Sequence, residues 1–443
     1  MKHKIAIFFE NVRENFWLLP SIMVIVSIGM AIGLVYVDRG LERDTLAAIR
    51  VFYTGGAEGA RELLSTVASA MMSVTGVTFS ITIVALSIAS SQFGPRLLRN
   101  FMRDTGNQIV LGTFVSTFIY CLLVLRTIRS AEEAFFVPFI SVTIAILLAI
   151  LSIGVLIYFM HHVSSSINAE NVISLIQKDI EKAIEKLYPD AERYTADFED
   201  FVDEEVLEKL EQKGMVIRAE KSGYVQGVDY DSLLNTAQSE DVIMDVKVRA
   251  GDFIDQDSEI IHIVPAKQFD EDRHNDLQAA VIIGARRART QDVEYEINQL
   301  VGIAVRALSP SLNDPFTAMS AIDQLGAALS NMAERNIPPS YRHDENGDFR
   351  LLLNTVTFQG AVDTAFNKIR QYGHNSVSVL IRLLETLTII GNHTQDPEKH
   401  YALKRQADLL WSSSQDAGFV KADLEDIRSR YLSLLKTTGN HEG

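Results

Sequence analysis

Cysteine is almost absent from this chain of 443 residues, which contains only Cys121. A single cysteine can form no intrachain disulfide and cannot build a cysteine-based metal cluster. Common motifs of hydrolases, metalloproteases and nucleotide-binding proteins (GxSxG, HExxH, a Walker loop, and GxGxxG at a strand–helix junction) are also missing. The sequence therefore gives no reason to expect an enzyme, a bound metal ion or a cofactor.

Charged residues are missing from four long apolar windows. Each window is about as long as a helix needs to cross a hydrocarbon core of roughly 30 Å. The windows are Phe16–Val37, Leu63–Ser90, Ile109–Leu125 and Val137–Met160. They predict four transmembrane helices. The first is not typical of a cleaved signal peptide, because its apolar run is too long and no small-residue cleavage site follows.

Basic residues are scarce in the remainder of the chain. Residues 1–160 contain 12 Lys plus Arg and 10 Asp plus Glu, which leaves 29 basic and 47 acidic residues for 161–443. Such an acidic region would repel the phosphates of a nucleic acid. We therefore expect a lipid bilayer as a partner, and no nucleic acid.

The short loops around the first two windows predict the orientation in the membrane. Basic residues precede the first window and follow the second, which places both of these sides in the cytoplasm. The 38–61 loop opposes this assignment, since it also contains four arginines, interleaved with acids. With an even number of spans, both termini are expected to be cytoplasmic. Three arginines after the second window share a helical face that suits anionic lipid headgroups: Arg96, Arg99 and Arg103.

Beyond the fourth window the pattern changes twice. An apolar helical stripe follows first, and it could continue the fourth span as one long helix. Residues 215–264 then alternate between apolar and polar positions and contain glycine turns, which predicts short strands. From 268 onward the pattern is helical almost throughout. We therefore expect four regions: transmembrane helices (1–163), connecting helices (164–213), a small cytosolic β-domain (214–266) and a cytosolic helical domain (267–443).

The second window is unusual because Ser and Thr fill eleven of the positions from 65 to 91. Several of its small residues recur every seven residues or lie on the adjoining row of the helix. They could pack closely against neighbouring helices. Alternatively, they could line a water-filled path between subunits, where hydroxyls replace part of the hydration of an ion. The candidate pore-lining residues are Thr66, Ser69, Ser73, Gly76, Ser80 and Ser87.

A second candidate site lies in residues 285–318, where arginines gather in an otherwise acidic region. Asp314 and Pro315 are typical of an N-cap and the first position of a helix, which explains them without any ligand. A polar crevice at that helix start could still receive an anion. The candidate ligand-binding residues are Arg286, Arg289, Arg306, Asn313, Asp314 and Thr317.

Three motifs together resemble a known bacterial family. They are SSQFGPRLLRNFMRD, YFMHHVSSSIN and RTQDVEYEINQLVGIAVRALSPSLNDPFTA, and they resemble the predicted membrane proteins with domain of unknown function 2254. The resemblance extends over nearly the whole chain. Where members of this family tend to have Gly after Ser-Pro, this chain has Ser311. The resemblance implies an inner-membrane protein with several N-terminal spans and a cytosolic C-terminal region, and no particular activity.

The expected fold is an α-helical membrane protein with four transmembrane helices, a cytosolic small β-barrel or sandwich and an all-α C-terminal domain. The favoured hypothesis is a homo-oligomeric channel or pore-like transporter for inorganic ions in the bacterial inner membrane, with a cytosolic regulatory region. The alternative is a membrane-anchored sensor or scaffold whose cytosolic domain binds a small anion or a protein partner.

Overall fold

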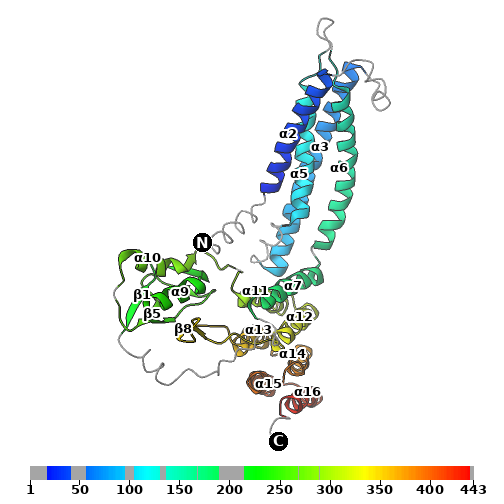
Figure 1. Cartoon of the computed structure of the whole chain (residues 1–443). Coiled ribbons are helices and arrows are strands. Elements are labelled where there is room, and N and C mark those ends of the chain that lie inside the picture. The colour runs from blue at the N-terminus through cyan, green and yellow to red at the C-terminus, as the bar shows by residue number, and fades with distance from the viewer. Residues whose placement is uncertain are drawn as a thin grey trace. The chain divides into compact units, whose positions relative to one another are not determined.

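The structure is a computed structural model, shown in Figure 1. It describes residues 17–40, 56–94, 104–129, 136–166, 168–188, 214–267, 269–288 and 290–439. The chain divides into two compact units, Met1–Asn171 and Val172–Gly443. The predicted boundaries at 163, 213 and 266 stay a prediction.

The first unit contains four helices that are long and apolar enough to cross a membrane, as predicted. The central one is α5, because 56% of its most apolar window is buried, against 17–22% in the other three. It packs against all three other helices. The four are α2 (Leu18–Gly40), α3 (Ala57–Phe93), α5 (Thr105–Leu125) and α6 (Phe139–Ser166).

Two of these helices end where the sequence changes its backbone preference. Helix α3 stops at Phe93 because Gly94 adopts a φ of 95°, which favours glycine, and a proline follows. Helix α6 ends at Ser166 and a separate helix, α7 (Ala169–Leu187), begins three residues later. The expected single long helix through this region is therefore wrong. The side chain of Asn168 accepts a bond from the Glu170 amide at 2.9 Å, as a cap residue does.

The second unit contains two β-sheets that share one apolar core. The larger sheet has the strand order β1-β5-β3-β8-β7, and the smaller has the order β4-β2-β6. Neighbouring strands are antiparallel except β3 and β8, which are parallel. The strands are β1 (Met215–Arg218), β2 (Gly223–Val228), β3 (Ile243–Val246), β4 (Phe253–Ile254), β5 (Glu259–Val264), β6 (Val281–Gly284), β7 (Tyr341–His343) and β8 (Phe349–Leu353).

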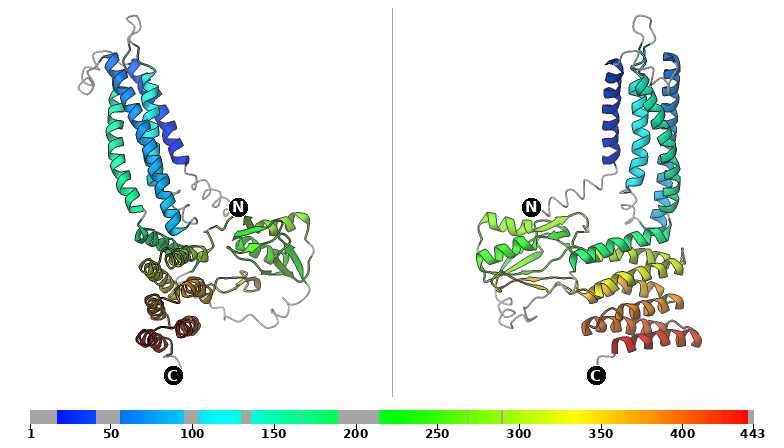
Figure 2. Two further views of the ribbon diagram at one scale, coloured as in Figure 1. Left: turned by 180° about the vertical axis from the view of Figure 1, so that it is seen from behind. Right: turned by 45° about the vertical axis from the view of Figure 1, so that its right-hand side comes forward.

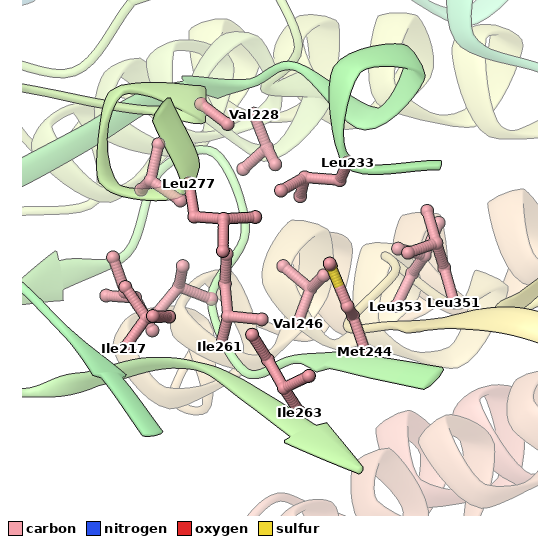
Figure 3. Packing of buried hydrophobic residues seen from close by; sticks show 14 of the residues in the cluster. Ile217, Val228, Leu233, Met244, Val246, Ile261, Ile263, Leu277, Leu351 and Leu353 are labelled. Carbon is pink, nitrogen blue, oxygen red and sulfur yellow. The ribbon is translucent and has the colours of Figure 1, made fainter. Parts of the chain in front are cut away.

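Figure 3 shows this core from close by. Met244 and Ile263 of neighbouring strands point into it, and Leu233 of α9 (Tyr230–Glu240) and Leu277 of α10 (Glu271–Ala280) reach it from helices. Leu351 of β8 joins the same core although it lies about a hundred residues from β3. The described strands form two separate sheets and not one closed barrel, so the predicted barrel or sandwich stays a prediction.

The rest of the second unit is a stack of helix pairs. Helices α11, α13 and α15 pack in one row, and α12, α14 and α16 pack in a second row beside it. Their bounds are α11 (Val293–Ala307), α12 (Pro315–Ala333), α13 (Phe358–Gly373), α14 (Val377–Gly391), α15 (Pro397–Asp416) and α16 (Lys421–Gly439). Figure 2 shows the layers in two further views.

The β7–β8 hairpin interrupts this stack between α12 and α13 and pairs with β3. The hairpin and β6 are strands within residues 267–443. The prediction of an all-helical domain in this region is therefore wrong. The hairpin was not expected because the alternation in β8 is short and its pairing partner is far away in the sequence.

Candidate functional site

The predicted pore-lining residues lie on one exposed face of α3. Thr66, Ser69, Ser73, Gly76, Ser80 and Ser87 are all exposed in the single chain. A methyl group added at Gly76 would meet no atom within 4 Å. The stripe therefore does not pack against the helices that the structure describes.

A different face of α3 makes the contacts inside the bundle. It is built from Ala60, Leu64, Ala68 and Met71, which are buried against α5 and α6. The alanines allow α5 to approach closely, as small residues do in membrane helix contacts. Packing within the single chain thus explains this face and leaves the hydroxyl stripe unexplained.

Two hydroxyls of the stripe, those of Ser73 and Ser80, are bonded to their own helix. Ser73 Oγ donates to the carbonyl of Ser69 at 3.0 Å, and Ser80 Oγ donates to the carbonyl of Gly76 at 2.9 Å. Each hydroxyl proton is thereby satisfied without a neighbour, which lowers the cost of facing an apolar environment. The remaining lone pairs of each oxygen can still accept a bond or contact a cation.

A buried carboxylate holds one end of the bundle together. Asp38, in the last turn of α2, accepts hydrogen bonds from the amides of Ile140 and Ser141, both at 3.0 Å, and from the Ser141 hydroxyl at 2.7 Å. It thus caps the N-terminus of α6, where a negative charge is favourable. Tyr120 Oη donates to the carbonyl of the same Ser141 at 3.0 Å. Sequence analysis missed this contact because Asp38 lies just outside an apolar window.

The opposite end of the bundle contains a histidine–carboxylate pair. His162 Nε2 lies 2.5 Å from Asp104 Oδ2, and Asp104 also caps α5 by accepting from the Gly106 amide at 2.8 Å. The Tyr158 ring stacks on His162 with 5.3 Å between centroids. A methyl group at Gly106 would come within 2.7 Å of His162 Nε2, so a larger residue there would displace the His162 ring. The predicted headgroup-binding residues Arg96, Arg99 and Arg103 lie outside the described residues.

The second candidate site is explained in part by helix capping. Asp314 Oδ1 accepts from the Thr317 amide at 3.1 Å, Asp314 Oδ2 accepts from the Thr317 hydroxyl at 2.5 Å, and Pro315 occupies the first turn of α12. The Thr317 hydroxyl bond holds the pKa of Asp314 below its usual range. The predicted cap is confirmed. Asp314 occupies the Thr317 amide, which an anion bound at this helix start would need as a hydrogen-bond donor.

The candidate ligand residues do not gather in one place. Arg286 precedes α11, next to Arg287, which is bonded to the N-cap Asp292 of that helix at 2.7 and 2.8 Å. Arg306 lies in the last turn of α11, about 20 Å away along the helix axis. Exposed Asn313 follows in the next turn with a φ of 46°, and Arg289 lies outside the described residues.

A cleft lies elsewhere in the second unit, and no sequence motif predicted it. It is a cleft of about 1300 Å³ beside β7, the edge strand of the larger sheet, and the first turns of α13 and α15. Lys399 lies on its wall and donates to the carbonyls of Ala333 and Arg335, both at 2.9 Å. Burial lowers the pKa of Lys399, and Asp396 opposes that effect. Other lining residues include Tyr341, Arg342, Thr357 and Tyr401.

Among the residues that the structure describes, no group of three or more His, Cys, Asp or Glu side chains is arranged to hold a metal ion. What the described geometry offers is therefore an exposed polar helix face, two capped bundle ends and one cleft.

Comparison with known proteins agrees with the resemblance in the sequence. No solved structure matches the chain significantly. An uncharacterized protein of Mycobacterium bovis and one of Mycobacterium tuberculosis are each 31% identical over 412 residues, covering 90% of this chain and 76% of theirs. The family described as "Predicted membrane protein (DUF2254)" matches residues 13–388. Together with the four apolar helices, this match means that the chain belongs to the family of predicted membrane proteins with domain of unknown function 2254.

Proposed function

We propose that the protein is a homo-oligomeric channel or pore-like transporter in the bacterial inner membrane, with α3 lining the path. One observation carries the proposal: all six predicted pore-lining residues are exposed, while a separate face of α3 packs inside the protomer. The Ser73 and Ser80 protons are satisfied within the helix, but lipid tails offer no donor to the oxygens of this face and no close packing to its small side chains. Water or another copy of the chain supplies both better.

The spacing of the stripe supports contact between copies. Thr66, Ser69, Ser73, Gly76 and Ser80 follow one another at intervals of three and four residues, and Ile83 and Ser87 continue the pattern. A seven-residue repeat of this kind keeps one face of a helix turned toward a parallel neighbour. Small side chains then leave space along the axis between several copies.

The chemistry of the stripe favours a cation over an anion. The Ser73 and Ser80 protons are donated to their own helix, so the outward side of each oxygen presents lone pairs. Glu58 and Glu62 are exposed on the same face at the start of α3. Their charges would concentrate cations at that mouth. The cytoplasmic placement of both termini, inferred from basic residues near the first two spans, belongs to this proposal.

Conductance of the full chain in liposomes is the test. We expect Ser73→Leu and Ser80→Leu to reduce ion flux at least about tenfold. Raising the free-energy barrier to permeation by roughly 1.4 kcal/mol has that effect. Ser21→Leu is the matched control, because Ser21 is an exposed serine on α2 and off the stripe. Flux that is absent from the unaltered chain, or unchanged by both α3 substitutions, would refute the proposal.

The cleft favours a second candidate, the membrane-anchored sensor or scaffold. Its lining combines Arg342, Lys399 and aromatic side chains with the acids Asp344, Asp396 and Glu398, of which Asp344 is paired with Arg350. This mixed set suits a polar ligand with a planar group. The residues first expected to bind an anion are not among those lining it. A thermal-shift screen of phosphates and nucleotides tests this candidate. A shift lost in Arg342→Ala, kept in Arg306→Ala and accompanied by no conductance would favour the sensor.

A further inference from the structure

We propose that residues 333–336, at the end of α12, form a coupling segment that links ligand binding in the cleft to the end of α7. The proposal deepens the second candidate function and rests on the cleft being a ligand site. It makes Arg335 and Lys399 positioning residues, because their hydrogen bonds join the cleft wall to the end of α7. All of these contacts lie within the second unit.

The coupling segment is held from the cleft side by Lys399. The ammonium group of this buried residue donates to the carbonyls of Ala333 and Arg335, both at 2.9 Å, and lies 3.8 Å from a carboxylate oxygen of Asp396. Lys399 lines the cleft, and so does Asn336 of the coupling segment. Two of its three protons therefore have carbonyl acceptors, and an ammonium this buried must replace any acceptor that it loses.

The same segment is tied to α7 by the side chain of Arg335. Arg335 Nη1 donates to the carbonyl of Tyr188 at 2.9 Å, and Arg335 Nε donates to the side chain of Asn331 at 2.7 Å. Tyr188 directly follows α7 and is buried, and its amide donates to the carbonyl of Ile184 at 2.8 Å. Because the last carbonyls of a helix have no partner within the helix, Arg335 supplies one to the end of α7.

A second and weaker contact holds the same end of α7. Lys186 Nζ donates to the carbonyl of Thr290 at 3.4 Å, which is longer than the usual range for such a bond. Burial raises the pKa of Tyr188, and Glu294 of α11 adds to this effect. The end of α7 is therefore buried within the second unit, and Arg335 makes the stronger of the two bonds.

One residue, Arg335, thus connects the cleft wall with α7. Its carbonyl accepts from Lys399 and its guanidinium donates to Tyr188, so a shift of its backbone changes both contacts. A ligand that brings a hydrogen-bond acceptor to Lys399 competes for the protons donated to the coupling segment. Its binding then favours a state in which the end of α7 is held less tightly, because both sites bias the same element.

Helix α7 is suited to such a response by its place in the sequence. It begins three residues after the end of α6, the last candidate membrane span. A membrane-anchored sensor needs a response to its ligand in the part of the chain next to the anchor, and in sequence α7 is that part.

Hydrogen exchange of the full chain in detergent tests the coupling. Cys121 is first replaced by Ala, and Tyr401→Cys then places a single thiol at an exposed position that lines the cleft. Sulfonatoethyl methanethiosulfonate adds a hydrogen-bond acceptor there, and the trimethylammonium reagent of similar size adds bulk without an acceptor. Ser412→Cys is the matched control, because Ser412 is also exposed on α15 but is not among the residues lining the cleft.

We expect the sulfonate label on the Tyr401→Cys variant to speed exchange in the last turn of α7 about fivefold, the factor that loss of one hydrogen bond gives. The trimethylammonium label, and both labels on the Ser412→Cys variant, should leave α7 unchanged. With Arg335→Gln added, the same amides should exchange faster without a label, and the sulfonate should add nothing. Exchange in α16, followed in every variant, reports whether the fold is intact.

Unchanged exchange in α7 with the sulfonate label would overturn the coupling. Equal effects of the two labels, or a sulfonate effect that persists with Arg335→Gln, would overturn it as well. Lys399→Met supplies an independent check. It removes the donors and keeps most of the bulk, so it should speed exchange at the end of α7 without any label, and unchanged exchange there would also overturn the proposal.

Failure of the coupling can be told apart from failure of the sensor function. A ligand found by the thermal-shift screen, together with unchanged exchange in α7, would keep the sensor function and remove the coupling. A screen without any ligand, together with the expected exchange in the labelled variants, would remove the sensor function and leave the coupling intact.

Discussion

Single carboxylates fix helix starts in both units. Asp38 supplies a cap to α6 from another helix, while Asp314 supplies one to its own helix, α12. In each case the carboxylate satisfies amides that would otherwise lack a partner and places negative charge at the positive end of a helix. At the residue scale these contacts are worth on the order of 1 kcal/mol each.

Substitutions of Asp314 should distinguish the stability contributed by its capping hydrogen bonds from that contributed by its negative charge. We expect Asp314→Ala to destabilise the second unit by about 1 kcal/mol, whereas Asp314→Asn keeps most of the cap. Because the pKa of Asp314 is lowered in the folded protein, its ionised form contributes stability above the ordinary pKa of a carboxyl, and that contribution is lost as the pH falls through the lowered value. Thermal unfolding of the unaltered chain and both variants in detergent, at pH 7 and in acid, measures these losses of stability. An equal loss for Ala and Asn at pH 7 would contradict the role as a cap.

The two caps also differ in how far they could be predicted. Asp314-Pro315 is recognisable because both partners are adjacent in the chain. Asp38 bonds to an amide 102 residues away, and no local pattern encodes that partner. The same reasoning applies to His162 and Asp104, which meet only when α5 and α6 pack.

At the scale of the single helix, α3 has two faces. The alanine face packs inside the chain, and the serine face is exposed. Hydropathy predicted its span, and the seven-residue spacing predicted its polar stripe. Which of the faces packs inward could not be predicted, since the alanine face and the serine face are both small and both compatible with close contact. The structure assigns the alanine face to α5 and α6.

A large residue at Gly76 should disrupt assembly without unfolding the protomer. Gly76→Leu introduces a side chain where no neighbour lies within 4 Å, so the single bundle tolerates it. If copies meet along the stripe, the same leucine separates them, and a smaller particle is expected in detergent by mass photometry. Gly154→Leu is the control, because Gly154 of α6 is equally open. A particle of unchanged mass would contradict contact through α3.

The whole second unit is joined by the β7–β8 hairpin, which leaves the helix stack and completes a sheet begun a hundred residues earlier. The sequence predicted helices here with some success, because helical periodicity is local. The hairpin was missed because a parallel pair such as β3–β8 is specified by partners distant in the sequence.

Truncation of Leu351 should therefore weaken helices as well as strands. Leu351 is fully buried in the shared core, so Leu351→Ala should cost about 2–5 kcal/mol. Hydrogen exchange should show faster exchange in both β5 and α13, whereas Leu432→Ala, at a half-exposed site, changes little. Faster exchange confined to the strands would show that sheet and stack unfold separately.

The Asp38 contact has a consequence for biogenesis. When the ribosome has delivered α2 to the bilayer, this carboxylate has none of its three donors, because Ile140 and Ser141 are translated about a hundred residues later. Its charge is matched only once α6 has inserted beside α2. A nascent chain arrested before that point would contain an acid without these three hydrogen bonds, so only the arrival of α6 completes this end of the bundle.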